Sequence, residues 1–542
     1  MTDRIDRLPT IDRAAAEPSS VTTRAAVVHE RGGVAVIADI ALAAPGPDEL
    51  LVEVKASGVC PTDLFGIDGG AGDRFPAVFG HEGAGVVLAV GDRVDAIRPG
   101  DHVVLSFASC GACDACLGAH PAYCARFGEL NYGARAAQAH DGERVTTGWM
   151  SQSSWAEHVV VPASSAAVIG DDVPWRVAAP LGCGILTGAG TVLGALRPGP
   201  GDALLVLGAG TTGLAAVLAA RHRGVSRIAV SDPAAGRRAL ALELGATEAH
   251  DPAALDRVTG FTHALDTVGT QATVDTALAA LAPQGVAATV ALKPGANPVT
   301  VSQTRLLWGR TLTGVIEGDA VVSRDVPLLA ALWRAGRLPI ERLVTQYAFA
   351  DVDTAIAEAR GGRVIKAVLT MDQDAAEPPA AASTPPSLLD ALRAGAVPDA
   401  DLPALWRSLP PVATTTLRGF WRGWGLTHDH RAGRLLERSR WRGKLFRSDD
   451  EVAPIVCEAG DGTLVADVAL ARGGATLRTL AHDGVTTAAM VYDGQPIIDH
   501  FVRLAPDAVL GVMTGRDTDD QGRPFFFVLD RSDDDPRAAG IA

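Results

Sequence analysis

The sequence predicts an α/β protein with a parallel sheet, followed by a mostly β region at its C-terminal end. Near the middle of the chain, an apolar run at 203–207, a glycine-rich turn at 208–213, a helical pattern and a second apolar run at 227–230 follow one another. This order is typical of a parallel βαβ unit. Further along, short alternating runs such as 463–469 and 486–492 are separated by Asp-Gly and Gly-Gly turns, which indicates antiparallel strands.

Length and composition agree with a globular chain of several domains. At about 150 residues per domain, 542 residues predict about three to four domains. Hydrophobic residues make up 47% of the chain and charged residues 20%, which is typical of folded proteins. The 48 Lys and Arg against 63 Asp and Glu give a net charge of −15. This charge argues against nucleic acid or an anionic membrane as a partner, because both bind clustered positive charge.

The N-terminal residues and the most apolar stretch predict neither a secretory signal nor a membrane span. Residues 1–23 contain no apolar core segment, so we expect a tail there. The stretch 203–220 is interrupted by three glycines and reads as strand, turn and helix. Four of the seven cysteines lie within fifteen residues, which favours metal ligation in a reducing cytoplasm over disulfides.

Composition also divides the chain. Residues 24–370 are rich in Gly, Val and Ala, and 25–105 show short β-type runs broken by glycines. The segment 372–387 reads DQDAAEPPAAASTPPS and predicts an extended linker. After it, 11 of the chain's 26 aromatic residues lie in the last 155 residues, so we expect a further domain at 388–533 with its own core.

The crowded cysteines have the spacing C-x2-C-x2-C-x7-C. Four thiolates can surround zinc tetrahedrally and leave no position for water, so such a site is structural. Unliganded, clustered loop thiols would be an oxidation liability. The predicted structural zinc ligands are Cys110, Cys113, Cys116 and Cys124.

Three further candidate ligands, Cys60, His81 and Cys183, lie far apart in the sequence. Their surroundings read GVCPTD at 58–63, GHE-x2-G-x5-G-x2-V at 80–94 and LGCG at 181–184. The second motif matches, at every fixed position, the zinc signature of the zinc-dependent medium-chain dehydrogenase/reductase family, which the chain resembles over about residues 24–370.

Other segments are similar to the aryl- and benzyl-alcohol dehydrogenase branch of that family. They read NYGAR at 131–135, SQSSWAEHVV at 151–160, LGCGILTGAG at 181–190 and VIEGD at 315–319. The resemblance implies a GroES-like, β-rich catalytic domain formed by 24–183 and 320–371 and a doubly wound Rossmann domain at 184–319. It also implies a homodimer or homotetramer.

The resemblance assigns Cys60, His81 and Cys183 to a catalytic zinc, so two zinc ions per subunit are expected. Two thiolates and one imidazole leave a fourth position for water or an alcohol oxygen. In the family, the residue matching Glu82 lies near the metal and can act as a transient ligand. The alternative for Glu82 is a partner for a buried arginine.

The next residues along the chain complete the implied site. Thr62 matches the hydroxyl residue that takes the proton from the alcohol, and Asp63 matches an acid that orients the zinc-binding histidine. The chain departs from some relatives at Phe65, where they carry a histidine of the proton relay, and at Pro61, where they carry a basic cofactor contact. The route of the proton to solvent stays open, and Phe65 favours a bulky apolar substrate.

The turn GAGTTG at 208–213 is a GxGxxG motif in the required context, because it follows a strand and opens a helix. Its glycines allow backbone N–H groups to approach a pyrophosphate at the helix N-terminus. Asp232 follows at the end of the next strand, where a carboxylate binds a ribose 2′-OH and repels a 2′-phosphate, so NAD is favoured over NADP. Arg237 is the residue that could favour NADP; in the family its position usually flanks the adenosine ribose. The predicted cofactor-binding residues are Gly208, Gly210, Thr211, Thr212, Gly213, Asp232, Arg237, Val268 and Lys366.

Beyond the linker, GFWRG at 419–423 and WRGK at 441–444 resemble the GXWXG family. VYDGQPIIDHF at 491–501 and VLGVM at 509–513 resemble the companion domain of unknown function. The resemblance implies a lipocalin-like β-barrel, and such barrels hold one small apolar ligand. The candidate polar residues there are Tyr492, Asp499 and His500, either as ordinary barrel-mouth residues or, as an Asp499–His500 pair, in acid–base work.

Together these features predict an NAD-dependent, zinc-containing alcohol dehydrogenase for bulky apolar primary alcohols and aldehydes of aromatic, allylic or terpenoid type. The barrel would bind or further transform the aldehyde, because covalent fusion raises the local concentration of the product. One alternative makes the barrel the main activity, as an isomerase, lyase or carrier for apolar carbonyls. A second alternative is a thiol-dependent formaldehyde dehydrogenase.

Overall fold

The structure is a computed structural model that describes residues 20–531 except 71, 73, 140–141, 293–296, 372–387, 396, 506 and 517. The predicted linker and most of the predicted N-terminal tail lie outside the described residues. The first strand begins at Val21, inside the segment predicted as a tail.

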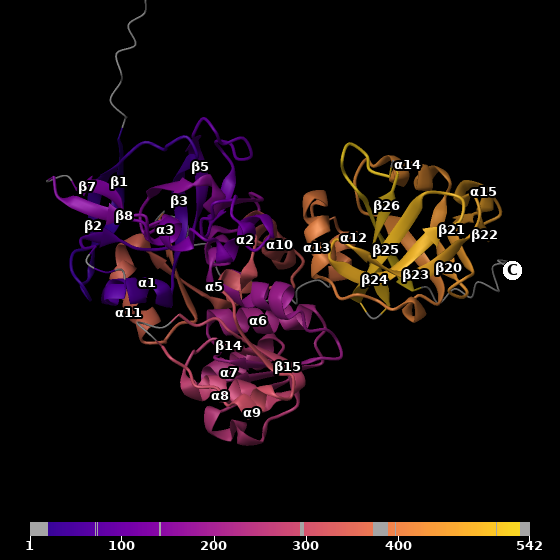
Figure 1. The fold of residues 1–542 in the computed structure, drawn as a ribbon. Coiled ribbons are helices and arrows are strands. Elements are labelled where there is room, and N and C mark those ends of the chain that lie inside the picture. The colour runs from indigo at the N-terminus through magenta and orange to yellow at the C-terminus, as the bar shows by residue number, and fades with distance from the viewer. Residues whose placement is uncertain are drawn as a thin grey trace, which may run out of the picture.

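The first part of the chain forms a small closed barrel and a larger sheet (Figure 1). The barrel consists of β1 (Val21–Val28), β2 (Ala35–Leu42), β7 (Arg135–Ala139), β8 (Arg144–Thr147) and β4 (Ala77–Val78). The larger sheet has the order β10 (Ala166–Ile169), β6 (His102–Leu105), β5 (Gly83–Val90), β3 (Glu49–Val59), β18 (Lys366–Thr370) and β17 (Val344–Ala348), with β9 (His158–Pro162) paired to β3. Because β17 and β18 come from late in the chain, this sheet joins segments that the central parallel sheet separates in sequence.

Short helices connect these strands, and several of them begin next to a predicted metal ligand. They are α1 (Pro61–Phe65), α2 (Asp114–Leu117), α3 (Phe127–Tyr132), α4 (Trp175–Ala178), α5 (Gly184–Gly190) and α11 (Val352–Arg360). α1 and α5 both begin directly after a predicted zinc ligand, Cys60 and Cys183 respectively.

The middle of the chain forms a parallel sheet with the strand order of a doubly wound fold. Its order is β13 (Glu248–His250), β12 (Arg227–Ser231), β11 (Ala203–Leu207), β14 (Phe261–Asp266), β15 (Leu281–Thr289) and β16 (Thr311–Gly314). The accompanying helices are α6 (Thr211–His222), α7 (Ala235–Leu244), α8 (Gln271–Ala280) and α9 (Gln303–Leu306). The four residues Leu204–Leu207 of β11 are all buried, as expected for a strand covered by helices on both faces. This sheet confirms the predicted Rossmann fold.

The C-terminal part is an antiparallel barrel preceded by two helices, α12 (Leu388–Arg393) and α13 (Leu402–Ser408). In the described residues its strands follow the order β20 (Trp441–Phe446), β19 (Gly419–Gly425), β27 (Phe525–Arg531), β26 (Ala508–Gly515), β25 (Ile497–Ala505), β24 (Val485–Tyr492), β23 (Ala475–His482), β21 (Val452–Glu458) and β22 (Leu464–Ala466). An additional pairing of β20 with β21 closes the ring. The helices α14 (Arg431–Arg438) and α15 (Val468–Ala471) lie between strands in sequence. The closed ring fits the predicted lipocalin-like barrel.

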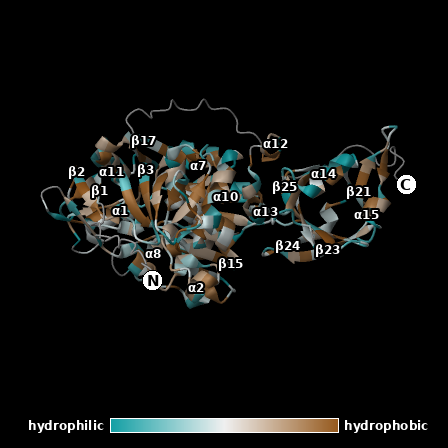
Figure 2. Ribbon diagram, turned by 90° about the horizontal axis from the view of Figure 1, so that it is seen from above, coloured by the Kyte–Doolittle hydropathy of each residue, from teal (hydrophilic) through white to brown (hydrophobic). Residues whose placement is uncertain are grey.

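The barrel packs against the dehydrogenase part through α13 and the long helix α10 (Val322–Arg334) (Figures 1 and 2). Buried side chains of α13, among them Leu405 and Trp406, belong to the same apolar cluster as Leu332 of α10. The Arg334 guanidinium lies 2.9 Å from the Asp401 carboxylate.

Among the described residues, no single helix combines the length and hydropathy of a membrane span. Trp175–Gly182 and Gly184–Leu196, which are bent by 63° relative to each other, reach that length and hydropathy only when taken together.

Candidate functional site

The structure brings together four of the predicted residues in one buried cluster. The ligand atoms of Cys60, His81, Glu82 and Cys183 all lie within 4.8 Å of one another. Their convergence follows from the sheet: β3 and β5 are antiparallel neighbours, so the end of β3, where Cys60 follows, lies beside the start of β5, which His81 and Glu82 precede. Cys183 closes the cluster from the turn before α5, with its Sγ 3.2 Å from Nε2 of His81.

Asp63 orients the histidine of this cluster. Its Oδ1 lies 2.7 Å from Nδ1 of His81 and also accepts hydrogen bonds from the backbone N–H of Gly80 and the indole of Trp149. Its Oδ2 accepts the backbone N–H of Cys60. Since a carboxylate only accepts, Nδ1 of His81 carries the proton and Nε2 is left as the metal-binding atom. The carboxylate of Asp63 therefore lies against the His81 ring, as the family resemblance implies.

The surroundings of Cys60 lower the pKa of its thiol and favour the thiolate. A hydrogen bond from Cys183 lowers the pKa of Cys60 well below its usual range against the opposing effect of burial, and the charges of Lys366 and His81 lower it further. A thiolate is the form of cysteine that binds metals.

Glu82 is held by a buried cation, which is a lysine in place of the arginine considered from the sequence. Its Oε1 lies 2.8 Å from Nζ of Lys366 and accepts the backbone N–H of Gly184 at 3.3 Å. Burial raises the pKa of Glu82 to about 7, although Lys366 acts in the opposite direction. Its Oε2 is buried and has no hydrogen-bond partner among the described residues. An orphaned carboxylate oxygen beside two thiols and an imidazole fits a zinc ion, whose usual ligands are these three groups.

Lys366 itself is 2% exposed and donates also to the carbonyl of Val59. Its predicted contact with the cofactor pyrophosphate would require the pair with Glu82 to open. That role stays a prediction, as does the role of Thr62, which lies in α1 and is partly exposed.

The four-cysteine lobe forms the second candidate metal site. The sulfur atoms of Cys110, Cys113, Cys116 and Cys124 lie within 4.8 Å of one another. The backbone N–H groups of Ala125 and Cys116 lower the pKa of Cys113 to about 6. The four thiols form a complete tetrahedral set for zinc, with no further side chain needed.

The glycine turn before α6 has the geometry that a nucleotide requires. Gly208 has φ +98°, and a Cβ on Gly213 would lie 1.8 Å from the carbonyl oxygen of Gly208, so neither position accepts a side chain. A Cβ on Gly210 would meet no atom within 4 Å, so the turn is open on that side. Asp232, at the end of β12, accepts the backbone N–H of Ala209 at 2.8 Å and is therefore fixed against the turn.

The remaining predicted cofactor residues lie around the same edge of the sheet. Thr211 donates to the carbonyl of Ile365, Arg237 donates to the carbonyl of Gly362, and the backbone N–H of Val268 binds Asp266. Thr212 is the second residue of α6. The assignment of these residues to a cofactor stays a prediction.

Glu317 is a candidate active-site residue that the sequence did not single out. Burial raises its pKa to about 7, and the charges of His81 and Cys60 act on it, which places it near the cluster. Thr187 of α5 donates to its carboxylate. The non-glycine residues Glu317 and Asp319 both have positive φ, and such strain is common at functional sites. The only sequence indication was the VIEGD segment, quoted for its resemblance.

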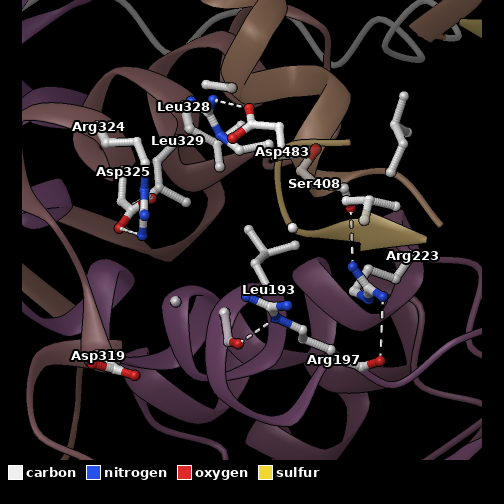
Figure 3. Close-up of a pocket in the computed structure, with 18 of the residues that line it drawn as sticks. Leu193, Arg197, Arg223, Asp319, Arg324, Asp325, Leu328, Leu329, Ser408 and Asp483 are labelled. Atoms are coloured by element: carbon white, nitrogen blue, oxygen red, sulfur yellow. Dashed lines mark hydrogen bonds and ion pairs between the residues drawn. The ribbon is translucent and has the colours of Figure 1, made fainter. Parts of the chain in front are cut away.

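A pocket of about 320 Å3, lined by both apolar and charged side chains, lies between the barrel and the preceding part of the chain (Figure 3). Gly318 and Asp319, which follow Glu317 in the chain, form part of its wall. On the far side, Arg223 donates to the carbonyl of Ser408, which fixes the end of α13.

In the barrel the structure separates two of the predicted residues. Asp499 and His500 are consecutive in β25, and consecutive strand residues point to opposite faces. Asp499 lines the barrel cavity with Tyr492, whereas the His500 ring stacks on His482 at 4.6 Å. The two cannot act as an acid–base pair, so that hypothesis is wrong. The partner that the sequence missed is Lys444, whose Nζ lies 2.9 Å from Asp499.

Four family models match the chain in this order. They are the alcohol dehydrogenase GroES-like domain at 46–171, the zinc-binding dehydrogenase model at 211–333, the GXWXG protein model at 404–462 and a domain of unknown function (DUF4334) at 473–531.

Relatives with assigned names match the dehydrogenase part. A geraniol dehydrogenase of Castellaniella defragrans is 40% identical over 367 residues, which is 64% of this chain and 98% of the relative. A probable alcohol dehydrogenase of a Pseudomonas species is 42% identical over 289 residues, which is 49% of this chain and 90% of the relative.

Solved structures give the same result. An alcohol dehydrogenase zinc-binding domain protein of Burkholderia ambifaria superposes with a TM-score of 0.64 at 36% identity, over 66% of this chain and 100% of the other. Benzyl alcohol dehydrogenase of Acinetobacter calcoaceticus superposes with a TM-score of 0.62 at 33% identity, over 65% of this chain and 100% of the other. The chain belongs to the zinc-dependent alcohol dehydrogenases of the medium-chain family, with a GXWXG-type barrel fused to its C-terminal end.

Proposed function

We propose that this enzyme interconverts bulky apolar primary alcohols and their aldehydes, with NAD as the hydride carrier and two zinc ions per subunit. The observation that carries the proposal is the buried cluster of Cys60, His81, Glu82 and Cys183, with His81 oriented by Asp63. The names of the relatives, geraniol and benzyl alcohol dehydrogenase, support an aromatic, allylic or terpenoid alcohol as substrate.

The residues of the cluster and their neighbours have separate roles in this proposal. Cys60, His81 and Cys183 hold the metal, and Asp63 keeps Nε2 of His81 free of a proton. Zinc, when bound there, supplies Lewis acidity that lowers the pKa of an alcohol hydroxyl. Thr62 takes the hydroxyl proton and passes its own proton on, because a hydroxyl group does not keep two. The side chain of Phe65 cannot exchange a proton. The relay therefore passes the proton to water or to another residue.

The nucleotide site favours NAD. NAD, when bound at the glycine turn, would supply the hydride acceptor. Asp232 is buried at the end of β12 and is fixed by the N–H of Ala209, so its carboxylate would accept the ribose hydroxyls and repel a 2′-phosphate.

The substrate assignment is tested by NAD reduction with the full-length protein. Benzyl, cinnamyl, geranyl and perillyl alcohols are compared with the adduct of formaldehyde and glutathione. We expect kcat/KM for the best apolar alcohol to exceed that for the adduct by at least about tenfold. The reverse order would establish the thiol-dependent alternative.

The barrel's part in catalysis is tested in the same assay by mass analysis of the carbon product. We propose that the barrel binds a small apolar substrate or product of the dehydrogenase, so the aldehyde is expected as the only product. A further product that disappears when residues 388–542 are deleted would instead make the barrel an isomerase or lyase.

A further inference from the structure

The barrel contains an open cavity of about 750 Å3 that is lined mainly by apolar side chains. Its walls include Leu436 of α14, Trp441 at the start of β20, Ile455 of β21 and the stacked rings of Phe525 and Phe527. This volume is within the range of small-molecule sites, which are typically apolar with a few placed polar groups.

The placed polar groups are Lys444, Tyr492 and Asp499, all of which are buried. Nζ of Lys444 lies 2.9 Å from Oδ2 of Asp499 and donates to the hydroxyl of Tyr492 and to the carbonyl of Pro454. These contacts use all three donors of an ammonium group. The rings of Trp441, Tyr492 and Phe527 lie 5.1–5.6 Å from Nζ and further stabilise the cation.

Asp499 keeps one oxygen for a ligand. Its Oδ2 accepts from Lys444 and, at 3.4 Å, from the hydroxyl of Tyr492. Its Oδ1 is buried and has no hydrogen-bond partner in the part of the chain that the structure describes. A buried carboxylate oxygen without a partner is costly, and a ligand that supplies a donor removes that cost.

Oδ1 of Asp499 is a hydrogen-bond acceptor, and this property distinguishes the alcohol from the aldehyde of the dehydrogenase reaction. The donors of Lys444 are used within the protein, so the cavity offers an acceptor. A primary alcohol has an O–H donor that satisfies a carboxylate oxygen. An aldehyde has only an acceptor oxygen, which a carboxylate repels.

Five arginines at the cavity, Arg431, Arg434, Arg438, Arg472 and Arg516, offer a different ligand chemistry, that of an anion. All five are exposed, so water and salt screen their charges. The buried carboxylate, which is not screened in this way, therefore decides the head group that enters the cavity.

We propose that the barrel is a binding site for the apolar alcohol substrate, whose hydroxyl group donates to Oδ1 of Asp499 while its carbon skeleton fills the aromatic cavity. The barrel then concentrates alcohol for the dehydrogenase and releases the aldehyde. This inference rests on the proposed function for the identity of the substrate class, but the binding itself needs neither NAD nor turnover.

The test compares three ligands of equal length, octan-1-ol, octanal and octanoate, on the full-length protein without NAD. Binding is followed by the fluorescence change of Trp441 in the cavity wall, which is assigned by its loss in Trp441→Phe. We expect octan-1-ol to bind about tenfold more tightly than octanal. Equal or tighter binding of octanal would overturn the proposal, as would preferential binding of octanoate, which would establish an anion site.

Asp499→Asn gives a sharper test because it replaces the hydrogen-bond acceptor that faces the cavity with a hydrogen-bond donor. Lys444 and Tyr492 require an acceptor, so the amide carbonyl faces them and the amide NH2 faces the cavity. We expect the preference to switch to octanal in this variant and to stay with octan-1-ol in Asp493→Asn, the same change at an exposed residue outside the cavity. An unchanged preference in a folded Asp499→Asn variant would contradict the proposal.

Two further measurements cover a variant that does not fold and distinguish the barrel proposal from the proposed dehydrogenase function. If Asp499→Asn does not fold, the wild-type comparison of alcohol with aldehyde decides alone, and the double variant Lys444→Met with Asp499→Leu removes the ion pair as a unit. We expect the double variant to bind both ligands equally. Failure of the proposed dehydrogenase function would appear in the NAD assay, whereas failure of the barrel proposal would appear in the fluorescence titration.

Discussion

Asp63 sets the geometry of the catalytic cluster although it is not itself a proposed ligand. It accepts four hydrogen bonds, two from the cluster residues His81 and Cys60 and two from Gly80 and Trp149. A carboxylate in this position fixes the tautomer of the histidine and raises its basicity as a ligand.

The change Asp63→Asn therefore weakens the cluster without removing a ligand. We expect zinc affinity or kcat/KM to fall by about 10- to 100-fold, because the neutral amide holds the protonated Nδ1 of His81 less strongly. The measurement is zinc content after dialysis together with steady-state kinetics. Asp95→Asn, at an exposed position, is the control and should match the wild type. Wild-type zinc retention and activity in Asp63→Asn would remove the orienting role.

His500 illustrates a residue whose effect is on stability. Burial, together with the charge of His482, lowers its pKa to about 4, whereas an unfolded histidine has a pKa of about 6.5. Between these values the unfolded chain binds a proton that the folded chain does not. His500 therefore makes the free energy of unfolding fall as the pH drops from about 6.5 to 4, by up to about 3 kcal/mol.

His500→Gln should make barrel unfolding less sensitive to acid. Denaturant unfolding at pH 7 and at pH 4.5 measures this, with the wild type losing more stability between the two pH values than the variant. An identical loss of unfolding free energy in both proteins would show that a group other than His500 causes the loss of stability in acid.

At the residue scale, spacing predicted the four-cysteine cluster, whereas only the family resemblance grouped Cys60, His81 and Cys183; the structure brings each set together. The sequence missed Lys444 and Glu317 because a lysine or glutamate has no pattern of its own. Their importance comes from burial and from partners such as Asp499 and Thr187, which are distant in sequence.

Among the secondary-structure elements, the turn between β11 and α6 has the most direct functional consequence. Gly210 has φ −82° and open space around its missing Cβ, so an alanine fits the empty turn. The same space lies where a pyrophosphate would approach the backbone. A substitution at Gly210 can therefore disturb pyrophosphate binding without disturbing the fold of the turn.

Gly210→Ala should raise KM for NAD by about tenfold or more, while the thermal unfolding temperature stays within the range of the wild type. Gly236→Ala in α7, where a Cβ also meets no atom within 4 Å, is the matched control and should leave KM unchanged. A normal KM in Gly210→Ala would place the pyrophosphate elsewhere.

Elements with strong periodicity were predictable, and the pairing between distant elements was not. The run 203–207, the glycine turn and the run 227–230 became β11, the turn and β12 as expected. The Asp499–His500 pair failed because strand alternation, which the sequence leaves undefined until the register is known, puts the two side chains on opposite faces.

For the whole molecule, the contact between the two parts depends on Arg334. Its guanidinium is 8% exposed and bridges Asp172 of the catalytic domain to Asp401 in front of α13. Removing the arginine leaves the carboxylate of Asp401, which is 11% exposed, without its cation. Loss of one partner of a buried pair costs up to about 3–5 kcal/mol.

Arg334→Ala should therefore loosen the barrel from the dehydrogenase. Calorimetry of the full-length protein is expected to show an earlier, separate transition in the variant. Arg342→Ala, which removes an exposed ion pair with Glu243, should change unfolding by no more than about 1 kcal/mol. A single unchanged transition in Arg334→Ala would mean that the apolar contacts alone hold the parts together.

The central claim is that NAD-linked turnover depends on a zinc ion held by Cys60, His81 and Cys183. The most direct test measures bound zinc and the rate of NADH formation with a benzyl-type alcohol in the same preparations of wild type, Cys183→Ser and Cys457→Ser. We predict two zinc ions and turnover in the wild type and in Cys457→Ser. In Cys183→Ser we predict one zinc ion, more than about a 100-fold loss of turnover and a preserved fold. Normal turnover in Cys183→Ser would contradict the account.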